Sequence, residues 1–161
     1  MDEGKVLHLG VSNFTPDQFD WLQSHLDLPM VANQVQASLL HTEPLFNGLF
    51  DYFQRYDIQP MIWSPLNGGE LFKGGNDQTV RVRIALIKMA EKYECTFDVI
   101  ALAWLLQLPV NPFPFVGTGQ LLHIKKAIKA TKLDIERQDW FELLEASLAN
   151  RFHKYNRQII T

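Results

Sequence analysis

Four short polar clusters in this sequence could bind a ligand, and each follows a short apolar run. They are Ser12-Asn13, Asn33-Gln34-Val35-Gln36, Trp63-Ser64-Pro65-Leu66 and Gly117-Thr118-Gly119-Gln120. They offer amides, hydroxyls and small residues, and they contain no pair of carboxylates or imidazoles. Such groups form hydrogen bonds but do not make a general acid and base. The clusters therefore indicate a binding surface rather than an acid–base centre.

The Gly117–Gln120 segment is the clearest ligand candidate. Glycines just before a helix let backbone N–H groups approach an anion, and the helix dipole favours negative charge there. His123, Lys125 and Lys126 lie in the first turns of that helix, where positive charge is unfavourable unless an anion is bound. A plain turn followed by solvated lysines explains the same residues, and the sequence leaves both interpretations open.

The other clusters also have structural interpretations. Capping of a helix is the simpler reading of Ser12 and Asn13 by spacing alone. Gln34 could be a hydrogen-bonded core amide, and Trp63 could simply fill the core. Asn67-Gly68-Gly69 is typical of a turn.

The apolar runs before the clusters are interpreted as strands, with helical patterns between them. The predicted strands are Val6–Val11, Met30–Val35, Gln59–Trp63 and Phe113–Val116. Strands that alternate with helices form a parallel sheet, in which ligands bind at the carboxyl ends of the strands. The sequence therefore predicts an α/β fold whose four clusters meet at one edge.

Helices are predicted from capping signals and apolar periodicity. Thr15-Pro16-Asp17-Gln18 is a capping box, so the first helix begins there and runs to about Leu26. The second predicted helix, Pro44–Tyr56, is weakened by Gly48, because glycine is unfavourable inside a helix. The later helices are predicted at Pro44–Tyr56, Val80–Tyr93 and Asp98–Leu108, on the face Ile124, Ala127, Ile128 and Thr131, and on the face Trp140, Leu143, Leu144 and Leu148.

Composition limits the class of protein. The 161 residues, 47% hydrophobic and 20% charged, predict a single compact domain over 1–161. A net charge of −3 gives no general reason to expect nucleic acid or an anionic membrane as partner. The single cysteine, Cys95, is expected to be a buried, inert thiol without a structural metal. No apolar run approaches 18 residues, and the start MDEGKV lacks the basic and apolar regions of a secretion signal, so we expect a cytoplasmic protein.

Five ordered motifs resemble the aldo-keto reductase family, most closely its bacterial oxidoreductases. They are GKVLHLGVSNF (Gly4–Phe14), NQVQ (Asn33–Gln36), WSPLNGG (Trp63–Gly69), ALAWLLQLP (Ala101–Pro109) and VGTGQLLHIKKAI (Val116–Ile128). The resemblance implies an eight-stranded (β/α) TIM barrel, of which this chain carries the C-terminal half, strands five to eight. It also implies NADPH as the cofactor and reduction of aldehydes and ketones to alcohols.

The resemblance assigns cofactor-binding roles by position. Ser12, Asn13 and Gln34 match the residues that hydrogen-bond the nicotinamide carboxamide, and Trp63 matches the aromatic residue that stacks on the nicotinamide ring. The remaining matches are Ser64 and Leu66 in the loop that follows the pyrophosphate, and Thr118 and Gly119, with Gln120 beside them, in the adenosine-phosphate loop.

The adenosine end departs from the family pattern. His123 stands where many members have an arginine that grips the 2′-phosphate, and Lys126-Ala127 replaces a Glu-Asn pair that commonly holds the adenine. Histidine is neither permanently charged nor bidentate, as arginine is. We hypothesise that Lys125 or Lys126 supplies the missing charge, so that NADPH binds more tightly than NADH.

The family's catalytic Asp, Tyr, Lys and His lie on the first four strands, before the segment that this chain matches. The tyrosines here, Tyr52, Tyr56, Tyr93 and Tyr155, lie in or near predicted helices or in the tail, and none is assigned a catalytic role. We therefore expect the chain alone to bind NADP(H) weakly and to be inactive on small carbonyl substrates, because the general acid is missing.

Half a barrel exposes two strand edges, which recruit other chains. Three arrangements fit: a homo-oligomer in which two copies close a barrel, a separate complementing N-terminal half, or a longer protein that was cut or whose start was misassigned. The main alternative function is a non-enzymatic half-barrel module that binds nucleotide or associates as a homodimer. An open sheet that binds another phosphate-bearing ligand ranks third.

Overall fold

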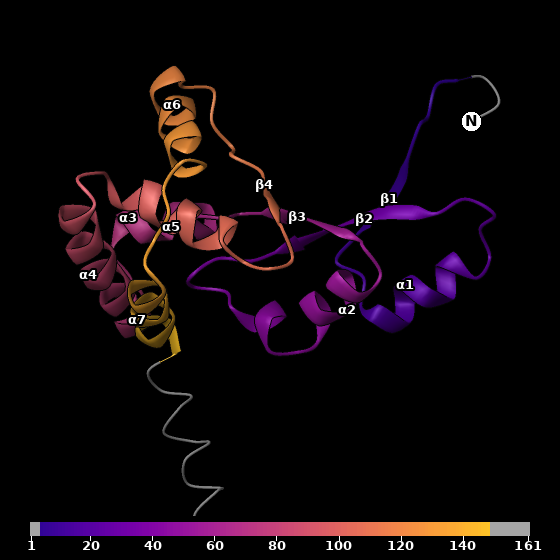
Figure 1. Cartoon of the computed structure of the whole chain (residues 1–161), viewed down its shortest axis with the longest axis horizontal. Helices are drawn as coiled ribbons and strands as arrows, with labels where there is room; N and C mark the ends of the chain where they lie inside the picture. The colour runs from indigo at the N-terminus through magenta and orange to yellow at the C-terminus, as the bar shows by residue number, and fades with distance from the viewer. Residues whose placement is uncertain (1–3, 149–161) are drawn as a thin grey trace, which may run out of the picture.

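The computed structural model describes residues 4–148, in which strands and helices alternate along the chain. The strands are β1 (Leu9–Ser12), β2 (Met30–Gln36), β3 (Gln59–Trp63) and β4 (Phe113–Pro114). They form one sheet in the order β1-β2-β3-β4, and every neighbouring pair is parallel (Figure 1). The predicted α/β fold with four parallel strands is confirmed.

The two outer strands are shorter than predicted. β1 begins at Leu9 rather than Val6, and its pairing with β2 shifts register between Leu9 and Gly10. Gly10 lies so close to β2 that a Cβ would sit 2.9 Å from the carbonyl oxygen of Ala32, so a side chain there would push the two strands apart. β4 ends at Pro114, although the Phe115 N–H still donates to the Ile62 carbonyl at 2.8 Å.

The helices agree with the predicted segments except at the second. Their bounds are α1 (Pro16–Gln23), α2 (Leu49–Arg55), α3 (Glu70–Lys73), α4 (Asp77–Lys92), α5 (Phe97–Leu106), α6 (Leu121–Ala130) and α7 (Arg137–Leu148), with 3-10 turns η1 (Glu43–Leu45) and η2 (Asn67–Gly69). The capping box is present, since Thr15 Oγ1 accepts from the Gln18 N–H and the Gln18 side chain accepts from the Thr15 N–H. The continuous helix predicted at Pro44–Tyr56 is wrong, because Gly48 adopts a left-handed φ of 82° and separates η1 from α2.

The core is built by helices that pack on one face of the sheet and on each other. α5 is buried nearly all round, because its sequence is apolar on almost every side, and Trp104 within it is fully buried. Trp104 stacks on Trp140 of α7 with ring centroids 5.1 Å apart, and each indole N–H donates to the other residue's backbone carbonyl. This reciprocal contact fixes α7 against α5.

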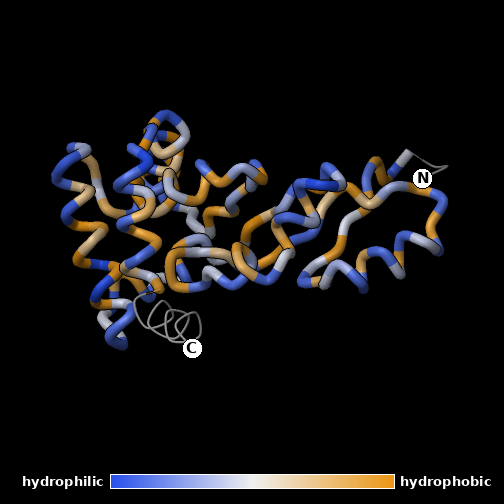
Figure 2. The backbone as a smooth tube through the Cα atoms, turned by 60° about the horizontal axis from the view of Figure 1, so that its bottom comes forward, coloured by the Kyte–Doolittle hydropathy of each residue, from blue (hydrophilic) through white to orange (hydrophobic). Residues whose placement is uncertain are grey.

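The apolar face predicted for α6 is only partly buried. Ile128 is 54% exposed and Ile124 is 37% exposed, whereas Ala127 and Ala130 make the packing contacts. α6 stands at the end of the molecule that also carries α4 and α7, and β1 and α1 lie at the other end (Figures 1 and 2). The expected face is therefore wrong in part, since small rather than large residues face the core.

The other face of the sheet carries a row of register-paired residues. Ser12 pairs with Gln34, Gln34 with Met61, and Met61 with Phe113. Because strand residues alternate between faces, the neighbours Val35 and Ile62 point into the helix-covered core, where both are buried. Figure 1 shows α1 and α2 together on one side of β1 and β2, with no described helix opposite them. The row therefore lies on an uncovered face.

Three further expectations concern single residues and membrane spans. Cys95 is half-buried rather than fully buried, and burial raises the pKa of its thiol. Tyr155 lies outside the described residues. Over residues 4–148, no helix combines the length and apolar character needed to cross a membrane.

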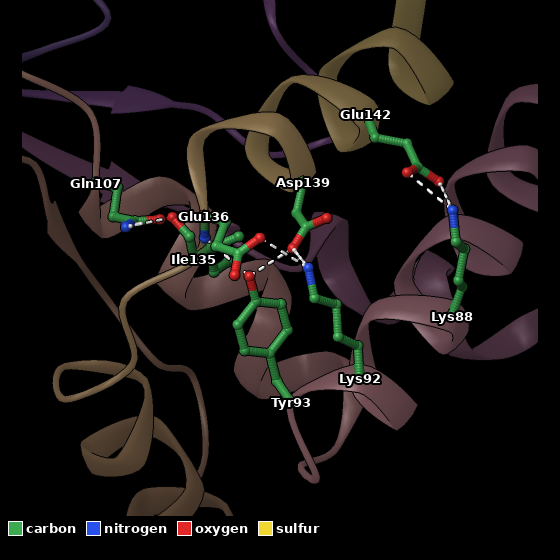
Figure 3. A network of polar contacts seen from close by, with 8 residues as sticks. All are labelled: Lys88, Lys92, Tyr93, Gln107, Ile135, Glu136, Asp139 and Glu142. Carbon is green, nitrogen blue, oxygen red and sulfur yellow. Dashed lines mark hydrogen bonds and ion pairs between the residues drawn. The ribbon is translucent and has the colours of Figure 1, made fainter.

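A polar network joins α4 to α7 (Figure 3). Lys92 Nζ donates to Asp139 Oδ2 at 2.7 Å and to Glu136 Oε2 at 2.9 Å, and Tyr93 Oη donates to Asp139 Oδ2 at 2.5 Å. Burial alone would raise the pKa of Asp139, but the bonds from Lys92 and Tyr93 outweigh it and lower that pKa below its usual 3.8. The ionised Asp139 therefore stabilises the contact between the two helices.

Replacing this carboxylate should destabilise the fold in a pH-dependent way. Asp139→Asn is expected to lower the free energy of unfolding by about 1.5 kcal/mol at pH 7, because charge-assisted bonds are lost. A lowered folded-state pKa contributes stability above pH 3.8 that is lost as pH falls through the folded pKa, so the difference from wild type should shrink below pH 3.8. Urea unfolding at pH 7 and pH 3 measures both effects.

Glu142→Gln, which removes only the exposed pair with Lys88, is the control and should lower the free energy of unfolding by less than about 0.5 kcal/mol. A difference that persists at pH 3 would contradict this account.

Candidate functional site

The four predicted clusters all lie at the carboxyl ends of the strands. Parallel pairing places the ends of β1, β2, β3 and β4 along one edge of the sheet. Two cavities open at this edge, a smaller one of about 430 Å³ and a larger one of about 790 Å³. Trp63, the last residue of β3, lines both of them. The larger cavity has the size of a typical small-molecule site.

Ser12, Asn13, Gln34 and Trp63 are brought together at the ends of the first three strands. Trp63 Nε1 donates to Asn13 Oδ1 at 3.0 Å, and Asn13 Nδ2 donates to Ser12 Oγ at 3.2 Å. Ser12 Oγ and the Asn13 N–H both donate to the backbone carbonyl of Gln34, at 3.1 and 2.8 Å. This chain of bonds holds the edge of the Trp63 ring and joins it to the backbone of Gln34, whose side chain is half-buried.

The structural interpretations of these four residues do not hold. The N-cap of α1 is Thr15, so Ser12 and Asn13 do not cap the helix. Trp63 is half-buried and hydrogen-bonded at a cavity wall, so it does not simply fill the core. The core amide is Asn33 rather than Gln34, because strand alternation turns Asn33 toward the helices.

Asn33, which belongs to the second predicted cluster, is a positioning residue to which the sequence assigned no role. Its side chain is 0% exposed, and it brackets the backbone of Phe14: Nδ2 donates to the Phe14 carbonyl at 2.8 Å, and Oδ1 accepts from the Phe14 N–H at 3.4 Å. These bonds hold the turn in which Asn13 has a φ of 58°. A polar residue on the covered face of a strand was the available signal.

The loop after β3 is a turn, as its glycines indicated. Ser64 has a φ of 51°, and its carbonyl accepts from the Asn67 N–H at 2.8 Å. Gly68 and Gly69 have φ values of 62° and 86°, so their conformation requires glycine. Ser64 and Leu66 line the larger cavity.

The loop after β4 differs, because its glycines are not explained by the turn. Neither Gly117 nor Gly119 has a positive φ, and a Cβ on either would meet no atom within 4 Å. Thr118 Oγ1 accepts from the Gln120 N–H and lies 3.2 Å from Nδ1 of His123. The loop therefore presents open backbone, which suits a group that approaches closely.

Of the two candidate cations, Lys126 lines the larger cavity and the exposed Lys125 does not. Lys126 Nζ lies 3.4 Å from Oδ2 of Asp98, a buried residue of α5 that also lines the cavity. His123 lines it from the preceding turn of α6. Asp98 is the second functional candidate that the sequence did not single out, because only the packing of α5 on α6 brings it there.

The tyrosines within residues 4–148 lie away from the strand ends. Tyr52 Oη donates to Asp20 of α1, and Tyr93 belongs to the network between α4 and α7. Tyr56 follows α2, where Arg55 lies over its ring. Over the same residues, no group of three His, Cys, Asp or Glu side chains could hold a metal ion.

Comparison with known proteins identifies the family. The model of the Aldo/keto reductase family matches residues 1–147. This chain belongs to the aldo/keto reductase family. It is 40% identical over 146 residues to oxidoreductase YdhF of Escherichia coli, covering 90% of this chain and 48% of that protein. It is 41% identical over 140 residues to a 6-dehydroglucose reductase of Agrobacterium fabrum, covering 87% and 46%.

A solved structure shows the same fold. The structure of a thermostable aldo-keto reductase with the inhibitor epalrestat matches with a TM-score of 0.80 at 24% identity, covering 90% of this chain and 50% of that one. This aldo/keto reductase chain therefore spans about half the length of the curated relatives that it matches. The name of the Escherichia coli relative describes that protein as an oxidoreductase.

The role of Asn33 can be tested by stability. Asn33→Ala should lower the free energy of unfolding by about 2 kcal/mol, because the Phe14 carbonyl and N–H lose their partner in a part-buried site. Hydrogen exchange of the Phe14 amide should also accelerate. Gln36→Ala, which removes the bond from Gln36 to Asn67 at the end of the same strand, is the matched control and should cost less. Equal effects of the two substitutions would rule out a special role for Asn33.

Proposed function

We propose that this chain forms the cofactor-binding half of an NADPH-dependent aldo-keto reductase, with its strands serving as the last four of a TIM barrel. The observation that carries the proposal is that Trp63 joins two groups of residues at one edge of the sheet. On one side stand Ser12, Asn13 and Gln34, and on the other the cavity reaches the open backbone of Gly117–Gln120. An extended dinucleotide needs such a continuous edge.

The nicotinamide end of the proposed site comprises Ser12, Asn13, Gln34 and Trp63. The hydrogen bond from Trp63 Nε1 to Asn13 holds the indole by its edge, so that a ring face remains for stacking. The Gln34 amide lies on the uncovered face, in register with Ser12, where it can bond a carboxamide. When bound, the nicotinamide would supply the hydride that reduces a carbonyl.

The phosphate and adenosine end comprises the two loops around the larger cavity. Ser64 and Leu66 border it from the β3 loop, while Thr118, Gly119 and Gln120 precede α6. Backbone N–H groups at the start of α6 favour an anion there. His123 and Lys126 add donors one turn apart on the same side of that helix.

The proposal includes that the chain alone does not reduce carbonyls. Within the described residues, no tyrosine stands at a strand end to donate a proton to the substrate oxygen, since Tyr52 and Tyr93 are bonded elsewhere. The uncovered sheet face and the free edges of β1 and β4 could be completed by four further strand–helix units. The proposal requires four such units, whether they belong to the same polypeptide or to a complementing N-terminal half.

A second candidate is a non-enzymatic module in which two copies close a barrel. The uncovered row Ser12, Gln34, Met61 and Phe113, with Phe113 53% exposed, supports it, because such a face needs a cover. Sedimentation distinguishes the two: a stable dimer favours the module, and a monomer that associates only with an N-terminal half favours the reductase.

Binding of the cofactor can be followed by fluorescence. NADPH should quench the tryptophan emission of the chain, and NADPH should bind more tightly than NADH because Lys126 favours the 2′-phosphate. Trp63→Leu should remove most of the quenching, because it deletes the ring at the proposed nicotinamide site. Trp21→Leu on the exposed surface of α1 is the control and should leave the affinity unchanged. Absence of quenching by wild type would count against the reductase half, and equal affinities would exclude the role of Lys126.

Catalysis should depend on the complementing half. The purified chain with NADPH and a panel of aldehydes is expected to show no NADPH oxidation at 340 nm. Addition of a separately produced N-terminal half from a full-length relative should restore oxidation. Turnover by the pure chain would refute the proposed division of labour.

A further inference from the structure

The larger cavity contains a carboxylate that no part of the proposed site uses. We infer that Asp98 limits the preference of the cavity for a cofactor with a 2′-phosphate, by pairing with Lys126. This inference rests on the proposed function and concerns its adenosine end. Lys126 provides the preference for NADPH over NADH, and Asp98 sets how large that preference is.

The carboxylate of Asp98 lies beside the ammonium group of Lys126 in the cavity wall. Asp98 lies in the first turn of α5 with its side chain 12% exposed, and Lys126 lies on α6 with its side chain 28% exposed. The Asp98 Oδ2 and Lys126 Nζ atoms are 3.4 Å apart, and both residues line the cavity. The positive end of the α5 dipole favours a carboxylate at this position. An anion that reaches Lys126 from the cavity therefore also comes close to Asp98.

The balance of charge in the cavity explains why the effect is selective. Among the described residues that line it, Asp98 is the one carboxylate and Lys126 is the one lysine or arginine. Together they carry no net charge, so a 2′-phosphate gains attraction from Lys126 and loses part of it to repulsion from Asp98. An uncharged 2′-hydroxyl experiences little of either. Asp98 therefore weakens the binding of NADPH, which carries the 2′-phosphate, more than the binding of NADH.

A purely structural role for Asp98 makes a different prediction. If the pair only fastened α6 to α5, its loss would loosen the cavity wall and weaken all adenosine ligands alike. If Asp98 instead accepted a bond from the adenine or ribose, its loss would again affect both ligands equally. The ratio of two affinities separates these roles from the proposed one, because it cancels every interaction that the two ligands share.

The experiment uses isothermal titration with adenosine 2′,5′-bisphosphate and adenosine 5′-monophosphate, which differ only in the 2′-phosphate. Asp98→Asn keeps the shape and a hydrogen-bonding oxygen but removes the charge. The ratio of the two association constants should rise about tenfold in this variant, as expected for one unit charge removed near a phosphate. Lys126→Met should lower the ratio. Glu142→Gln on α7, which makes the same change of net charge outside the cavity, is the matched control and should leave the ratio unchanged.

The outcomes separate this inference from the proposed function. An unchanged or lower ratio in Asp98→Asn, with wild-type binding intact, would overturn the inference alone. Equal weakening of both ligands would also overturn it and would assign Asp98 to the shared adenosine part or to the cavity wall. Binding of neither nucleotide by wild type would overturn the proposed function and the inference with it. Thermal unfolding of each variant confirms that the protein tested is folded.

Discussion

Parallel pairing of β2 with both β1 and β3 is the interaction on which the rest of the structure depends. It places Ser12, Gln34 and Met61 in one row and brings the ends of three strands to one edge. Gly10 makes the close approach of β1 possible, since any side chain there would collide with the Ala32 carbonyl. Without this pairing, Asn13 and Trp63, which come from separate segments of the chain, would not be close enough to form their hydrogen bond.

The pairing also divides the sheet into two unlike faces. Val35, Ile62 and the fully buried Phe53 lie on the side that the helices cover, and their burial supplies the hydrophobic free energy of the domain. The opposite side carries polar and half-exposed residues with no described helix over β1 and β2. In the proposed eight-stranded barrel, this face would turn inward.

The edge of the sheet is held rigid at one end and is more open at the other. Asn33 and the bonds among Ser12, Asn13 and Trp63 fix the first loops through side chains. Within the described residues, the loop at Gly117–Gln120 bonds to its own residues and to His123 and Ile124 in the first turn of α6, and α6 leaves Ile128 exposed. Rigid positioning thus coincides with the proposed nicotinamide end, and the adenosine end relies on charge, namely Lys126 and its partner Asp98.

The sequence by itself determined the elements and the family, because these depend on local or ordered signals. The Thr15 capping box, the nearly continuous apolar run of α5 and the ordered motifs each act over a few residues, and the left-handed Gly48 was the local signal that broke the predicted second helix. Only the tertiary structure decided which side chains face the site. Strand pairing chose Asn33 rather than Gln34 for the core, and the packing of α5 against α6 selected Lys126 and brought Asp98 to it. The direction in which a side chain points, toward the core or toward the site, depends on neighbours that are distant in the chain. The spacing of residues along one segment carries no information about those neighbours.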